Sequence, residues 1–100
     1  MKGVNALNEE QQQARTTLLV MTTYAREEGL RPSTLEGDAK YVFQALSAAV
    51  HAGNFAQEGQ RLGLQQVAAL ESNDAGAISR SRAHLAGFNK VEAIYARLQA

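Results

Sequence analysis

Apolar residues recur along this chain with the period of an α-helix, beginning with the segment 9–28. Apolar positions three or four residues apart form one face of a helix. Here they are Leu7, Ala14, Leu18, Met21 and Ala25, with Leu19, Val20 and Tyr24 widening the stripe. Asn8 and Gln11 have the spacing of a capping box, and Gly29 suits the left-handed residue that follows a helix. Pro32 prevents continuation, so we expect the first helix at 9–28.

A second stripe follows with the same period and gives the clearest helical signal in the chain. Its members are Leu35, Ala39, Val42, Leu46, Ala49 and Val50, with Phe43 beside them. Ser33 and Glu36 have capping-box spacing at its start, and Gly53 is placed to end the helix. Asn54 with Gln57 begins the next segment at once. The two helices are therefore expected to be antiparallel or sharply angled neighbours.

The third segment, about 55–70, is less regular because it contains Gly59 and Gly63. Each glycine costs about 1 kcal/mol relative to alanine inside a helix. A kink near Gly63, or close crossing of another helix, would accommodate them. A polar break at 72–74 then separates this segment from the last quarter of the chain.

In that last quarter, Ile78, Leu85 and Phe88 share one helical face. Gly87 is expected to interrupt this helix, and Asn89 with Glu92 has the spacing of one more capping box. A final apolar face then follows, made of Val91, Ile94, Tyr95 and Leu98. This pattern predicts five helices, or four if Gly87 lies within a continuous helix.

These segments define the expected fold class. Period-two alternation is absent, so we predict an all-α protein, a compact bundle of four to five short helices in which residues 1–100 form a single domain. Eighteen of the 100 residues are alanine. Alanine has the highest helix propensity and lets helix backbones approach closely, which favours small packed helices.

Composition and charge exclude several classes of function. Ten Lys and Arg balance ten Asp and Glu, so no net field attracts nucleic acid or a membrane surface. Direct nucleic-acid binding is therefore not expected. The sequence has no cysteine, no apolar run approaching the roughly 18–20 residues of a membrane span, and no apolar stretch typical of a signal peptide at its start. We expect a cytoplasmic protein without a membrane partner.

The stretch "LQQVAALESNDAGAISRSR", residues 64–82, has features of a DNA-reading helix-turn-helix. Ala68 and Ile78 match the small and apolar positions at which the two helices of that motif touch. The turn departs from the motif, since Ser72 stands where glycine is usual and Asn73 where an apolar residue is usual. The favoured interpretation is two core helices joined by a solvated, capped turn.

The sequence offers no constellation for catalysis or for binding a metal or cofactor. His51 and His84 have no acidic or histidine partner at ligand spacing, and we expect surface or capping roles for both. The serines lie outside any nucleophile elbow, and the glycines do not form a phosphate-binding loop. We therefore predict a protein that is not an enzyme and has no cofactor, no metal site and no catalytic residue.

Four carboxylates lie on either side of the tight turn between the first two helices, namely Glu27, Glu28, Glu36 and Asp38. As one patch, they would present negative charge to a basic groove of a partner. The alternative is a solvated turn, with Glu36 and Asp38 complementing the positive end of a helix dipole. Tyr41 lies off the apolar stripe of its helix, so we include it as an aromatic contact residue.

The stretch "MKGVNALNEEQQQARTTLLVMTTYAREEG", in a cysteine-free chain of 100 residues, resembles small phage-borne anti-CRISPR proteins. The resemblance is to the all-helical inhibitors of type I-F CRISPR-Cas surveillance complexes. It implies a stoichiometric, non-enzymatic inhibitor that binds Cas subunits in the host bacterial cell and blocks engagement of target DNA. These inhibitors share no motif, so the resemblance assigns no residue a role.

Three classes of function thus remain. The first is a protein-binding inhibitor. The second is a DNA-binding regulator that uses residues 64–82, and the third is a helical adaptor or oligomerisation module. Binding of duplex DNA that weakens steeply with salt would indicate the second class, and a stable oligomer would indicate the third.

Overall fold

A computed structural model describes residues 8–99, and within them the chain is all-helical, as predicted. It has four α-helices and one short 3₁₀ turn, with no strand in this range. The elements in order are α1 (Glu9–Glu28), η1 (Pro32–Thr34), α2 (Gly37–Ala52), α3 (Phe55–Ser72) and α4 (Ala75–Gln99). The bounds of α1 are those expected from the sequence.

The predicted ends of α1 and α2 are largely confirmed. The Asn8 carboxamide oxygen accepts a hydrogen bond from the Gln11 amide at 2.7 Å, and the Gln11 side chain accepts one from the Asn8 amide at 3.1 Å. Gly29 and Gly53 follow their helices with φ of 69° and 65°, a conformation that favours glycine. Local capping chemistry therefore fixes three of the four ends of these helices.

Other predicted caps are wrong. Ser33 belongs to η1 and not to a capping box, because this turn delays the start of α2 until Gly37. Glu36 is the N-cap of α2, and its side chain makes no capping hydrogen bond. Asn54 is the N-cap of α3, as predicted, but its side chain donates to the Gln57 side chain and accepts no hydrogen bond from the backbone of the helix.

The expected break at Gly87 is also wrong, and with it the capping pair Asn89 and Glu92. Residues 75–99 form one continuous helix, and both capping candidates are exposed on its surface. The bundle therefore has four helices and not five.

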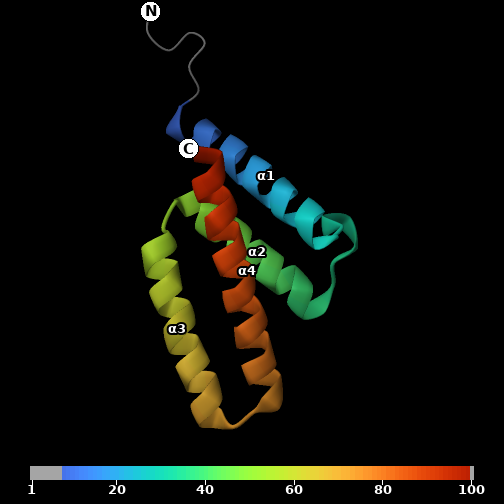
Figure 1. Cartoon of the computed structure of the whole chain (residues 1–100), viewed down its shortest axis with the longest axis vertical. Helices are drawn as coiled ribbons and strands as arrows, with labels where there is room; N and C mark the ends of the chain where they lie inside the picture. The colour runs from blue at the N-terminus through green and yellow to red at the C-terminus, as the bar shows by residue number, and fades with distance from the viewer. Residues whose placement is uncertain (1–7, 100) are drawn as a thin grey trace, which may run out of the picture.

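The core lies where α1, α2 and α3 converge on α4, the central helix (Figure 1). Its buried apolar residues come from all four helices and are Val20, Met21, Tyr24, Leu46, Val50, Leu62, Phe88, Val91 and Ile94. From Val42 onward the predicted stripe of α2 faces this core, whereas Ala39 is exposed and Leu35 precedes the helix.

The predicted stripe of α1 is partly wrong. Leu18 is 70% exposed and Ala14 is exposed, and Leu7 lies outside the described residues. The buried face of α1 instead includes Thr17 and Val20. The Thr17 hydroxyl donates a hydrogen bond to the Gln13 carbonyl at 2.7 Å. A threonine whose hydroxyl is satisfied within its own helix is tolerated at a buried position, so the apolar stripe alone gave a rotated face.

Gly87 is buried because three helices meet at this point of α4. A Cβ atom added here would lie 2.9 Å from the Tyr24 hydroxyl and 3.1 Å from Cδ1 of Leu46. Both neighbours are core residues, one on α1 and the other on α2. The glycine is thus required by close packing and not by a helix end.

The connection between α3 and α4 is a short, capped turn. Asn73 adopts a left-handed conformation with φ of 60°, and the Asp74 carboxylate accepts hydrogen bonds from the Gly76 and Ala77 amides at 2.9 and 3.4 Å. The two helices then run antiparallel and side by side, and their connected ends extend beyond α1 and α2 (Figure 1). We call this protruding part, residues 63–78, the hairpin arm; it follows Leu62 of the core and precedes Ser79 and Arg80, which lie beside α2.

We predict that Gly87→Ala destabilises the fold. The added methyl group must displace Tyr24 or Leu46, an overpacking cost of about 1–3 kcal/mol that exceeds the gain of about 1 kcal/mol in helix propensity. Chemical denaturation should show a lower free energy of unfolding. Gly63→Ala is the control, because nothing lies within 4 Å of its added Cβ and it should be neutral or stabilising. Equal effects of both substitutions would contradict the packing role of Gly87.

Candidate protein-binding surface

Glu27 and Glu28, the first half of the predicted acidic cluster, are ion-paired with α4. Lys90 Nζ donates to Glu28 Oε1 at 2.7 Å, and Arg97 Nη2 donates to Glu27 Oε2 at 2.8 Å. The hydrogen bond that Lys90 donates to Glu28 raises the pKa of the Lys90 ammonium. These two carboxylates join the first and last helices, and their charge is locally compensated.

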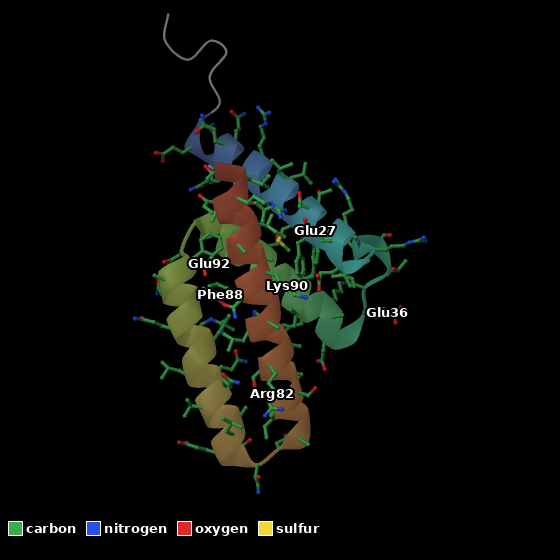
Figure 2. All side chains as sticks on the ribbon, in the orientation of Figure 1. Glu27, Glu36, Arg82, Phe88, Lys90 and Glu92 are labelled. Atoms are coloured by element: carbon green, nitrogen blue, oxygen red, sulfur yellow. The ribbon has the colours of Figure 1, made fainter. Side chains whose placement is uncertain are left out.

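Glu36 and Asp38, the second half, lie at the connection between α1 and α2. Figure 2 shows Glu36 on this connection, away from Glu27 and Lys90. Both side chains belong to exposed residues, and no ion pair within residues 8–99 involves either of them. The first pair of carboxylates is therefore held in ion pairs with α4, whereas the second pair makes no ion pair within residues 8–99.

Tyr41 is 52% exposed and lies one turn after Asp38 on α2. The edge of its ring meets the His84 ring, with centroids 6.0 Å apart and planes at 79°. It also lines an open groove of about 550 Å³ between α2 and α3. One wall of this groove is lined with alanines of α2, and the ion pair of Glu58 and Arg61 lies on the other.

A second hollow of about 300 Å³ lies between the α1–α2 pair and α4. Its larger apolar lining residues are Tyr24, Leu30, Val42 and Phe43. Asp38 on α2 and Arg80 on α4 add one charge of each sign. Asp38 and Tyr41, two predicted site residues, thus lie on α2 at the borders of two separate hollows.

His84 is a buried residue that the sequence analysis placed wrongly on the surface. It is 2% exposed, and its Nε2 atom has no hydrogen-bond partner among the described residues. Burial, followed by the nearby Arg61 charge, lowers the pKa of its imidazole, while Glu58 acts in the opposite direction. The signal was its spacing, because His84 shares one helical face with the buried Ser81, Phe88 and Val91.

The contact that a helix-turn-helix would require at Ala68 is not made. Ala68 is exposed, and its neighbour Ala69 is the buried residue of this turn of α3. The helices of a helix-turn-helix cross at about 90–120°, whereas α3 and α4 run antiparallel (Figure 1). The stretch 64–82 is therefore part of a helical hairpin with a solvated, capped turn.

Residues 8–99 contain no group of three or more His, Asp or Glu side chains placed to hold a metal ion. Among the helices that the structure describes, none is both long enough and apolar enough to cross a membrane.

Comparison with protein-family models, with curated proteins and with solved structures finds no match for this chain. The surface around Tyr41 must therefore be interpreted from its own chemistry.

We predict that His84 makes the fold less stable in mild acid. Since its pKa is lowered in the folded state, the unfolded chain binds more protons, and the stabilisation present above pH 6.5 is lost as pH falls toward the folded-state pKa. Denaturation from pH 7.5 to 5 should show a steeper loss of stability in the parent protein than in His84→Leu, which removes the titrating group. Parallel pH profiles would contradict this assignment.

Proposed function

We propose that this protein is a non-enzymatic inhibitor that acts by occupying the surface of another protein. More specifically, we propose an anti-CRISPR protein that binds Cas subunits of a type I-F surveillance complex in the cytoplasm of the host bacterial cell and prevents target DNA from engaging. The observation that carries the proposal is Tyr41, a half-exposed aromatic side chain on α2 with Glu36 and Asp38 nearby.

Aromatic side chains supply much of the energy of many protein interfaces, especially when they are held rigidly before binding. Tyr41 has such support, because its ring packs edge-on against buried His84. The adjacent hollows give a partner two concave surfaces in which to place its own side chains. These features favour recognition of a folded protein over binding of a small molecule.

The charges near Tyr41 suggest what kind of partner surface would match. Glu36 and Asp38 are exposed and are not ion-paired within residues 8–99, so they favour a groove lined with Lys or Arg. Channels that hold DNA have this character. We propose that Glu36 and Asp38 imitate the negative charge of DNA. Because the whole chain has a formal net charge of zero, this imitation is confined to the edge of α2 where these two residues lie.

We predict that Glu36→Lys, Asp38→Lys and Tyr41→Ala, combined in one variant, weaken binding to a purified type I-F surveillance complex at least tenfold. The two reversals replace attraction by repulsion, and the third removes the aromatic contact. Calorimetric titration measures the affinity, and competition with labelled target DNA measures the inhibition. Circular dichroism should show unchanged helicity, because all three residues are exposed.

The control variant combines Glu10→Lys with Glu92→Lys, which changes the net charge equally at exposed positions outside this surface. It should retain full binding. Equal affinity of the triple variant and the parent protein would reject the surface, and no binding of the parent to the complex would reject the anti-CRISPR assignment.

A further inference from the structure

Helix α3 carries a second apolar face that nothing in the described structure covers. Leu64, Val67 and Leu70 are 72%, 52% and 50% exposed, and they follow one another at three-residue intervals. The buried residues of α3, Leu62 and Ala69, point to α4 on the other side. With about 100° between successive residues, Val67 lies roughly 140–160° around the helix from both. We call the exposed set the α3 stripe.

Gly63 adjoins the α3 stripe and has no role within the monomer that explains it. Its φ is not in the left-handed region, it lies inside the helix, and no atom lies within 4 Å of an added Cβ. Glycine at such a position costs about 1 kcal/mol relative to alanine. Gly87, by contrast, is explained by close packing. The backbone at Gly63 is therefore open to close approach from outside.

We propose that the α3 stripe binds a second copy of this chain, with the two α3 helices antiparallel about a two-fold axis at Val67. In this arrangement Val67 meets its own counterpart. Leu64 of each copy meets Leu70 of the other. Leu70 of one copy also lies over Gly63 of the other, where no side chain fills the space. A self-complementary patch of this kind is what a two-fold dimer requires.

The charges on α3 favour the antiparallel orientation. In a parallel pair, Glu71 of one copy would face Glu71 of the other. In the antiparallel pair these carboxylates are separated by roughly eight residues, about 12 Å along the axis. Asp74 then lies level with the uncharged Gln60 of the other copy. A formal net charge of zero adds no overall repulsion between the copies.

The position of the α3 stripe also fits two copies. It lies on the hairpin arm, which extends beyond α1 and α2 as two helices without a third layer (Figure 1). Two arms packed together would make a four-helix arrangement, which is a stable way to cover two-helix hairpins. The groove beside Tyr41 is lined by an earlier part of α3, so the dimer leaves that surface accessible.

The other exposed apolar pair, Leu18 and Leu19 on α1, provides a matched comparison. It lies near the exposed residues Arg15 and Arg26, so this helix face carries like charges toward both ends. Like charges disfavour contact between two copies of the same face. Leu18 is as exposed as Leu64 but is not expected to take part in self-association.

The first test compares Val67→Lys with Leu18→Lys by sedimentation equilibrium over a wide concentration range. The parent protein and Leu18→Lys should reach the dimer mass as concentration rises, whereas Val67→Lys should stay monomeric with unchanged helicity. A parent protein that remains monomeric throughout, or a Val67→Lys variant that dimerises equally well, would overturn the proposal.

The second test uses the absence of cysteine from the sequence. Val67→Cys places a thiol on the two-fold axis and should form an intermolecular disulfide readily under mild oxidation, whereas Leu18→Cys should not. Equal cross-linking of both variants would overturn the proposed geometry. Val67→Lys should still bind the surveillance complex through the surface at Tyr41, so failure of the dimer and failure of the proposed function give different results.

Discussion

The fold depends on the close approach of three helices at Gly87. Here α1 contributes the Tyr24 hydroxyl and α2 contributes Leu46, both within about 3 Å of where a side chain on α4 would begin. In a chain with few large apolar residues, such contact between backbone and side chains supplies packing that bulkier cores obtain from volume. The same contact sets α4 against α1, and so places Lys90 and Arg97 opposite the carboxylates of Glu28 and Glu27.

This dependence explains which features of the fold were predictable from sequence. Helix ends fixed by local chemistry, such as the Asn8 box and the glycines after α1 and α2, were identified because the signal and its cause lie within a few residues. Gly87 was misread because its cause is tertiary, and a glycine in a buried helix resembles a helix break in sequence. The rotated face of α1 has the same origin, since Thr17 satisfies its hydroxyl locally and is buried although it is polar.

The candidate site was predictable to a lesser degree. The exposure of Tyr41 followed from its position off the apolar stripe, but the sequence did not show that Glu27 and Glu28 face cations more than sixty residues away. The α3 stripe went unrecognised because α3 has apolar residues on two faces. Leu62 and Ala69 define one, and Leu64 and Val67 the other, so a single stripe does not describe it. His84 was taken for a surface residue because its residue type, and not its spacing, guided the assignment.

The central position of α4 has a consequence for synthesis of the protein. This helix comprises residues 75–99, and it supplies Phe88, Val91 and Ile94 to the core against which the three earlier helices pack. A nascent chain emerges from the ribosome with its N-terminus first. The apolar faces of α1 and α2 therefore have no partner on α4 until residues 75–99 have been synthesised and have emerged from the ribosome.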